Sequence, residues 1–537
     1  MAATMAWTHD YTPVHGSLGW SALVAAVPIL TLVVLLAGLR RPSWQAALGG
    51  LIAAAAVALF AYGMPVRLML GAAGYGAAFG LLPISWTIFW AVALYRLSVE
   101  TGQFEIIKDS IGRLTPDRRL QALLIAFAFG AFIEGASGFG TPVAVASAML
   151  TGLGFPPFYA AAICLLANTA PVAFGAIGTP LVTLAGVTGL PLSALSAEVG
   201  RICAPVSVFI PAYLMLVMGG LGALRAVLPA AAICGICFAV TQWLVSTYVG
   251  PYLTDILASL AATVGLITLL RIWRPADLPV PATQPLGVPL SRVVRGWAPY
   301  IFLVVFVLLW GLEPVKVLLN KATLILPWPG LDGLIERVPP AVAKPGPYAA
   351  KYTFALLAAS GTPALLATLA TAVMAGVSPA RLARSVGGTA RDLALPVLTA
   401  VAMLSLAFLM NYSGATATLG LAFAASGSLF PFFSALVGWL GVFLTGSDSS
   451  SNALFGNLQV ITAGRLGLSP ELMAASSSSG GVMGKMISLQ SIAVAAAATG
   501  LPAADEARLF RFTLKHSIFL ASVIGLLVTV YAYVLGG

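Results

Sequence analysis

Three ionisable residues, Glu134, Asp448 and Lys485, lie in stretches that otherwise contain apolar and small residues. A carboxyl group that loses its hydration is more easily protonated, so it can take up and release a proton. A lysine ammonium in a similar place can bind an anion through charge-assisted hydrogen bonds. Ionisable residues at membrane depth face the protein interior and are candidates for function. These three residues therefore indicate proton exchange and anion binding.

The two carboxylates have different neighbours in sequence. Glu134 is flanked by apolar and small residues, so loss of hydration favours its protonated form. Asp448 lies among four serines and an asparagine, whose donors favour the ionised form. Both residues are candidates for proton coupling, and we expect Glu134 to carry the proton and Asp448 to hold Lys485. The alternative for Asp448 and Lys485 is a fixed ion pair that only joins helices.

Polar residues near the three ionisable groups are candidates for binding a substrate. Each offers an ammonium, hydroxyl or amide group: Lys485, Ser137, Thr141, Asn168, Thr169, Ser447, Asn452 and Ser479. Hydroxyl and amide residues also join helices inside membranes, which is the alternative for them. We predict no metal site, since the three histidines lie apart and Cys234 and Cys237 lie in an apolar run typical of helix packing.

The elements that must position these residues are four segments in which Gly, Ser, Thr, Asn and Pro interrupt apolar sequence. They are "FIEGASGFGTP" (132–142), "ANTAPVAFGAIGTP" (167–180), "TGSDSSSNALFGN" (445–457) and "SSSSGGVMGKMISLQS" (476–491). These residue types weaken a continuous helix and leave backbone groups free. At bilayer depth, free backbone groups are tolerated only in protein or around a water-filled cavity, and free N–H groups suit a carboxylate. The segments predict a cavity near the middle of a membrane.

The composition is that of a membrane protein. Charged residues make up 8% of the 537 residues, hydrophobic residues make up 60%, and the mean hydropathy is +0.99. A soluble chain has about 25% charged residues. We predict an all-α polytopic membrane protein with about 12–14 transmembrane helices and several re-entrant or broken segments. The expected spans include 18–38, interpreted as a retained first span and not a cleaved signal, and 349–375.

Basic residues predict how the chain is oriented. The pair Arg40–Arg41 and the basic segments 96–119 and 271–295 are typical of cytoplasmic loops, which places the N-terminus outside. Residues 313–348 contain mixed charges and many prolines, as expected of an outside loop.

A weak internal repeat is visible. "FGAFIEG" (129–135) matches "LGVFLTG" (440–446), and "TGLP" recurs at 188–191 and 499–502, both 311 residues apart. The basic loop of the first copy has an uncharged counterpart in the second, so we predict two inverted-topology repeats. The predicted parts of the chain are N-terminal helices (1–83), a first transport repeat (84–250), connecting helices with an outside loop (251–390) and a second transport repeat (391–537).

The sequence resembles the lactate permease family of bacterial carboxylate symporters. The motifs that carry the resemblance are "FIEGASGFGTPVAVASAMLTGLGF", "CLLANTAPVAFGAIGTP", "FLTGSDSSSNALFGNLQVITA", "SSSSGGVMGKMISLQSIAVAAAATGL" and "LFRFTLKHSIF". The resemblance implies uptake of lactate, and often glycolate, with a proton across the inner membrane. Two positions depart from the family pattern: Ser449 stands where Thr is usual, and Leu489 where Pro usually follows "KMIS". We expect the second departure to bear on how that helix breaks.

We therefore expect a multi-pass symporter of the bacterial inner membrane, with a small 2-hydroxymonocarboxylate and a proton as its ligands. Its partner is the lipid bilayer, it binds no nucleic acid, and it needs no cofactor beyond the proton gradient. A P-loop is absent, so ATP does not drive it directly. Two alternatives are a membrane-embedded enzyme that uses Glu134 or Asp448 as a general base, and a passive anion channel.

Overall fold

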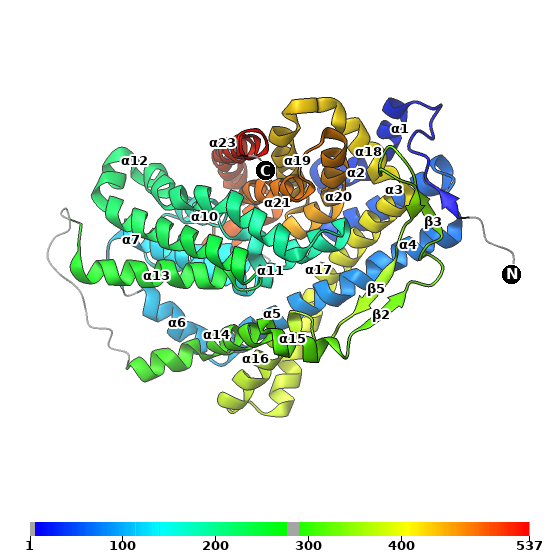
Figure 1. The fold of residues 1–537 in the computed structure, drawn as a ribbon. Helices are drawn as coiled ribbons and strands as arrows, with labels where there is room; N and C mark the ends of the chain where they lie inside the picture. The colour runs from blue at the N-terminus through cyan, green and yellow to red at the C-terminus, as the bar shows by residue number, and fades with distance from the viewer. Residues whose placement is uncertain (1–5, 113, 139, 276–288, 536–537) are drawn as a thin grey trace.

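The computed structural model describes residues 6–112, 114–138, 140–275 and 289–535. Figure 1 shows a body made almost entirely of helices. Within these residues, nine helices are long and apolar enough to cross a membrane, or up to 12 when each bent pair counts as one span. The prediction of a multi-pass helical membrane protein is confirmed; the count of nine spans lies below the predicted range of about 12–14, and the count of 12 meets its lower end.

The label η marks short stretches of π or 3-10 helix. In the N-terminal part of the chain these stretches are π-helical and continue the α-helices. In order, the elements of this part are α1 (Leu18–Ala25), α2 (Val27–Val33), η1 (Val34–Gly38), α3 (Ser43–Ala56), η2 (Val57–Ala61), α4 (Val66–Phe79), η3 (Gly80–Ser85), α5 (Trp86–Glu100), α6 (Gln103–Gly112) and α7 (Arg118–Gln121). The predicted first span, 18–38, is present as a pair of helices bent by 41°.

Two later parts of the chain have the same order of helices. The first contains η4 (Ala122–Phe129), α8 (Gly130–Ala136), α9 (Thr141–Gly152), α10 (Pro157–Ala167), η5 (Val172–Phe174), α11 (Gly175–Thr188) and α12 (Leu192–Tyr248). The second contains α19 (Phe430–Thr445), α20 (Asp448–Leu466), α21 (Pro470–Gly484), η7 (Lys485–Ile487), α22 (Leu489–Thr499) and α23 (Ala503–Tyr533). The ends of α11 and α22 lie 311 residues apart, as do the starts of α12 and α23. This common order supports the internal repeat.

The two repeats pack against each other in the centre of the molecule. Helices α9 and α10 of the first repeat contact α22 of the second, and α11 contacts α20. The bend between α10 and α11 is 66°, and the bend between α21–η7 and α22 is 42°. The second bend forms although Leu489 occupies the place of the expected proline, because the Ser488 hydroxyl accepts a hydrogen bond from the Ser491 N–H and starts a new helix.

The interrupted segments are more helical than the sequence predicts. In "SSSSGGVMGKMISLQS", residues 476–484 continue α21 without a break. A Cβ atom added at Gly480 would lie 2.1 Å from the Ala435 carbonyl oxygen, and one at Gly438 would lie 1.8 Å from the Ser477 carbonyl oxygen. These glycines therefore allow α19 and α21 to approach until their backbones touch, as small residues do in membrane proteins.

The remaining helices connect and support the repeats. They are α13 (Thr254–Ile272), α14 (Leu290–Gly311), α15 (Glu313–Asn320), α16 (Gly361–Met374), α17 (Pro379–Ser413), α18 (Ala415–Phe423) and the 3-10 turn η6 (Ala424–Leu429). Helix α17 contacts α3, α4 and α5 on one side and α20 on the other, so it joins the N-terminal helices to the second repeat. Residues 276–288, part of the predicted loop 271–295, lie outside the described residues.

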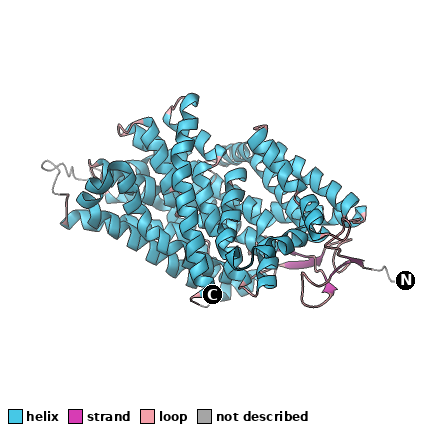
Figure 2. Cartoon of the chain, turned by 90° about the horizontal axis from the view of Figure 1, so that it is seen from above, coloured by secondary structure: helices cyan, strands magenta, loops and turns pink. Residues whose placement is uncertain are grey.

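Five short strands were not predicted from the sequence, and Figure 2 shows them at one end of the molecule. One sheet has the order β1 (Trp7–Thr8), β3 (Ile335–Arg337), β4 (Gly346–Pro347), and β2 (Leu324–Pro327) pairs antiparallel with β5 (Lys351–Phe354). The predicted span 349–375 is therefore wrong. Its first part pairs as β5, and its helix α16 has only 14 residues, fewer than the roughly 20 that cross a bilayer.

The inverted orientation of the two repeats remains a prediction, which labelling can test. In a background without the four native cysteines, we expect Asp109→Cys to react with an impermeant maleimide only from the cytoplasm. Ser428→Cys should react only from outside, and both positions are exposed. Reaction of both cysteines from the same side would contradict the inverted arrangement.

Candidate functional site

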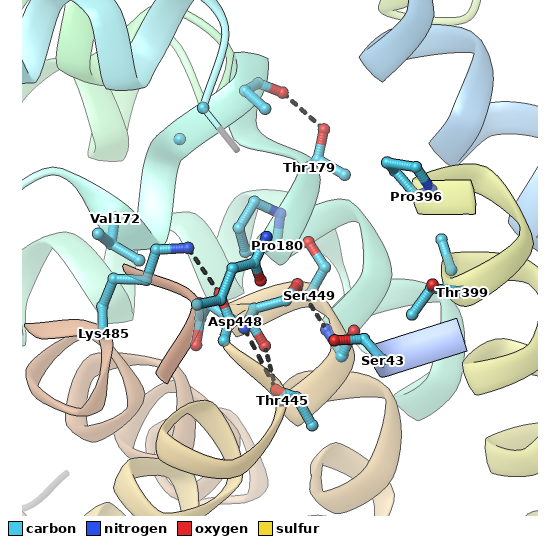
Figure 3. Close-up of a pocket in the computed structure, with 18 of the residues that line it drawn as sticks. Ser43, Val172, Thr179, Pro180, Pro396, Thr399, Thr445, Asp448, Ser449 and Lys485 are labelled. Carbon is cyan, nitrogen blue, oxygen red and sulfur yellow. Dashed lines mark hydrogen bonds between the residues drawn. The ribbon is translucent and has the colours of Figure 1, made fainter. Parts of the chain in front are cut away.

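A cavity of about 450 Å³ lies where the breaks of the two repeats meet the middle of α17. Its lining includes all three ionisable residues that the sequence singles out, Glu134, Asp448 and Lys485. In Figure 3, Lys485 and Asp448 lie on the side of the repeats, and Pro396 and Thr399 of α17 lie on the other side. A volume of this size suits a small molecule.

The Lys485 ammonium is held by a backbone group and not by a carboxylate. Its Nζ donates a hydrogen bond to the Gly446 carbonyl oxygen at 2.6 Å. Gly446 caps α19 with φ +71°, a left-handed conformation that favours glycine. Across the described residues, no carboxylate oxygen lies within 4.0 Å of Nζ, so the expected direct pairing of Lys485 with Asp448 does not occur here. An ammonium has three donors, which leaves two for a ligand.

Asp448 begins α20 and is held by its neighbours. Its Oδ2 accepts hydrogen bonds from the Ser478 hydroxyl at 2.7 Å and from the Asn452 amide at 3.3 Å. The same amide nitrogen lies 3.2 Å from the Pro180 carbonyl oxygen, which ties the first repeat to the second. Oδ1 is buried and has no partner among the described residues. Asp448 therefore has a fixed position and one free acceptor.

Glu134 lies on α8 and has a single donor. Its Oε2 accepts a hydrogen bond from the Asn168 amide at 3.2 Å. Its other oxygen lies beside Gly175, where an added Cβ would come within 2.5 Å of Oε1. The charge of Lys485 acts on both Glu134 and Asp448, which places the ammonium in the electrostatic neighbourhood of two carboxyl groups. The site therefore combines one cation with two acids.

The structure separates the predicted site residues into two groups. Those that line the cavity are Glu134, Thr141, Ser447, Asp448 and Lys485. Those that do not are Ser137, Asn168, Thr169, Asn452 and Ser479. In the second group, Asn168 and Asn452 bind the two carboxylates, which makes them positioning residues.

The hydroxyl residues of the second group make local contacts. Ser137 and Thr169 donate to the backbone carbonyl oxygens of Ile133 and Leu166, which precede them in the same helical segments. Ser479 is fully buried within α21. None of these three residues lines the cavity.

Several polar lining residues were not predicted: Ser43, Thr179, Thr399, Thr445, Ser449, Ser450 and Gln490. Five of them lie in the four interrupted segments and could have been predicted from those segments: Thr179, Thr445, Ser449, Ser450 and Gln490. Thr399 lies in the apolar middle of α17, where the only local signal is Pro396 inside the helix. Ser43 follows the basic pair at the start of α3.

A second cavity of about 750 Å³ adjoins the first and carries positive charge. Its charged lining residues are Arg40 and Arg41 and one acid, Glu506. The two cavities share four lining residues: Ser43, Thr445, Gly446 and Gln490. An anion can therefore approach the Gly446–Lys485 contact from a region whose arginines attract it.

Comparison with known proteins decides the family. The model of the L-lactate permease family matches residues 21–535, which include every residue that lines the cavity. The chain belongs to the L-lactate permease family. The resemblance predicted from the motifs is thus confirmed.

Members of the L-lactate permease family with 44% identity come from several bacteria. One is the glycolate permease of Escherichia coli (strain K12), aligned over 99% of each chain. Two others are the L-lactate permeases of Salmonella typhimurium (strain LT2), with 98% of each chain covered, and of Bacillus subtilis (strain 168), with 96%. All three are named permeases, which points to a transporter and away from an enzyme.

The contact between Gly175 and Glu134 generates a prediction for this permease. Gly175→Ala should push the carboxylate away from Asn168, because the added Cβ would lie 2.5 Å from Oε1, whereas the backbone at φ −61° accepts any residue. We expect transport of radiolabelled lactate to fall by about tenfold or more, as displacement of a functional group by 1 Å does in enzymes.

Gly152→Ala is the matched control, since no atom lies within 4 Å of a Cβ atom added there. Its transport should equal that of the wild type. Full activity of Gly175→Ala would show that the position of the Glu134 carboxylate is unimportant.

Proposed function

We propose that this protein takes up lactate and related small 2-hydroxymonocarboxylates, such as glycolate, together with a proton. It acts across the bacterial inner membrane with its N-terminus outside. The observation that carries the proposal is the Lys485 ammonium, which lines the cavity and is bonded only to a backbone carbonyl among the described residues. The names of the 44% identical relatives support the choice of substrates.

The substrate carboxylate binds to Lys485. A buried ammonium with no carboxylate oxygen in direct contact is costly, and the carboxylate of an incoming anion supplies that contact. The two remaining donors of Nζ suit the two oxygens of a carboxylate. Hydroxyl groups of Thr179, Ser447 and Ser449 line the same cavity and are suited to bind the 2-hydroxyl group of the substrate.

Charge balance couples the proton to the substrate. With both acids ionised, the site holds two negative groups and one positive group, and a substrate anion adds a further negative charge. If one carboxylate takes up a proton when the substrate binds, the total charge does not change. Proton and anion then favour each other's binding, and this mutual stabilisation is a coupling free energy between the two sites.

Glu134 is the better candidate for the proton that moves. Asp448 accepts hydrogen bonds from Ser478 and Asn452, and donors of this kind stabilise the ionised form. Glu134 accepts only the bond from Asn168 among the described residues, so its ionised form has less support. Asp448 then remains the fixed charge that balances Lys485 before the substrate enters.

Removal of the ammonium tests the anion site. Lys485→Met should weaken lactate binding by about 100-fold, the scale expected when a buried charged hydrogen-bond partner is removed. Isothermal titration of the purified protein measures the change. Arg201→Met is the control: this arginine of α12 lies over the Tyr531 ring of α23 and does not line the cavity, so its variant should bind lactate nearly as well as the wild type. Normal binding by a folded Lys485→Met protein would contradict the proposal.

Proteoliposomes test the coupling. The wild type should accumulate radiolabelled lactate when a proton gradient is imposed and should only equilibrate it without one. Glu134→Gln resembles the protonated acid, so it should retain exchange between two lactate-filled compartments and lose accumulation. The control Asp392→Asn removes an exposed carboxylate bound to Arg96 and should behave as the wild type.

Other outcomes of the same assay separate the alternatives. Equilibration without accumulation by the wild type indicates a passive channel, and conversion of lactate in detergent indicates an enzyme. Accumulation by Glu134→Gln but not by Asp448→Asn would show that the two acids have exchanged roles.

A further inference from the structure

A third buried acid, Asp255, lies outside the cavity and has no evident structural task. It belongs to the first turn of α13, and its side chain is 1% exposed. Both of its carboxyl oxygens are buried, and neither has a hydrogen-bond partner among the described residues. By contrast, Glu134 and Asp448 each accept at least one hydrogen bond.

The usual structural roles of an aspartate at a helix start are not filled by Asp255. It does not cap the helix, because the N-cap position of α13 is Leu253 and no side chain accepts a bond from the first turn. It also takes part in no ion pair among the described residues. An aspartate that only stabilised the fold would have such a partner.

Asp255 lies directly behind the Glu134 segment. Helix α13 packs on α8, and a Cβ atom added at Gly135 would lie 2.7 Å from the Asp255 Cβ. No side chain therefore separates Asp255 from the residue that follows Glu134. The two carboxyl groups are close enough for their charges to interact. Glu134 lines the cavity and Asp255 does not, so of these two acids only Glu134 faces the substrate site.

Among the described residues of α8, α12 and η4, which pack on α13, the only cations are Arg201 and Arg225 of α12, and Asp255 forms an ion pair with neither. Helix α12 contributes the Cys203 thiol, which lies within the electrostatic range of Asp255. The neighbouring turn η4 consists of apolar residues only. An ionised carboxylate in these surroundings is strongly unfavourable, because it is buried and has no partner among the described residues. Asp255 is therefore a carboxylic acid that holds its proton in this conformation.

We propose that Asp255 is a second proton-holding residue, which exchanges a proton with Glu134 during transport. The proton leaves an Asp255 carboxyl oxygen as an O–H bond forms on Glu134, and the reverse transfer restores the first state. Two neighbouring acids of this kind share protons as one coupled unit. The inference rests on the proposed proton coupling through Glu134, and it adds the residue that supplies the proton to Glu134.

The test uses the full-length protein in proteoliposomes with radiolabelled lactate. Asp255→Asn keeps the shape of the protonated acid but cannot release a proton, so lactate–lactate exchange should be unchanged. The initial rate of accumulation driven by a proton gradient should fall by about 100-fold or more, the lower end of the range expected when a proton-transfer group is lost. Ser259→Ala is the matched control: it lies one turn along α13, is buried, and donates only to the Ile256 carbonyl oxygen.

Two results with Asp255→Asn would overturn the inference. Accumulation equal to that of the wild type would show that no proton passes through Asp255. Loss of exchange together with accumulation would show that the residue supports the fold or the substrate site. Asp255→Glu provides a second test, because it keeps an acid in place: accumulation should persist with a shifted pH profile, and an unshifted profile would contradict the relay.

Glu134→Gln, measured in parallel, separates this inference from the proposed function. If Glu134→Gln still accumulates lactate, coupling through Glu134 is wrong, whatever Asp255→Asn does. If Glu134→Gln loses accumulation and Asp255→Asn does not, only the role of Asp255 is wrong.

Discussion

A lysine ammonium inside a membrane protein needs a negative partner or enough hydrogen-bond acceptors, and the arrangement of this site follows from how Lys485 meets that need. The fold provides one acceptor, the Gly446 carbonyl oxygen, and places Glu134 and Asp448 nearby without a direct ion pair. The cation is thereby held in position while two of its donors stay available. A direct ion pair with Asp448 would occupy a donor of the ammonium and neutralise the charge that an anion needs.

The breaks in the helices supply the backbone and side-chain groups that surround Lys485. Gly446 can present its carbonyl to Lys485 only where α19 ends and α20 begins, and Glu134 reaches the cavity near the end of α8. Contacts between the repeats, such as the Asn452 amide on the Pro180 carbonyl oxygen, hold the breaks together. If the repeats move relative to each other during transport, these contacts and the charges at the breaks change together. The side to which the cavity opens then depends on whether the substrate and the proton are bound.

Much of the site can be predicted from the sequence because charged residues in apolar surroundings are conspicuous. Glu134, Asp448 and Lys485 lie up to 351 residues apart, yet their surroundings mark them as members of one site. Asp255 cannot be found in this way. It lies beside a Tyr-Leu-Thr sequence near the end of a loop, where an exposed helix-capping aspartate is the ordinary expectation, and it is buried where α8 and α12 pack on α13. The sequence also does not show which hydroxyls face the cavity: Ser137 donates to the Ile133 carbonyl oxygen of its own helix, whereas Thr179 lines the cavity. The strand β5 was missed because its pairing with β2 depends on a partner outside the apolar run.

The most direct test of this account is an experimental structure of the protein with lactate bound. We predict that a carboxylate oxygen of lactate lies about 3 Å from the Lys485 Nζ, within the cavity between the repeats and α17. Asp448 should keep its contacts with Ser478 and Asn452. Lactate bound away from Lys485, with the ammonium paired directly to Asp448, would contradict the central claim that this lysine is kept free for the substrate.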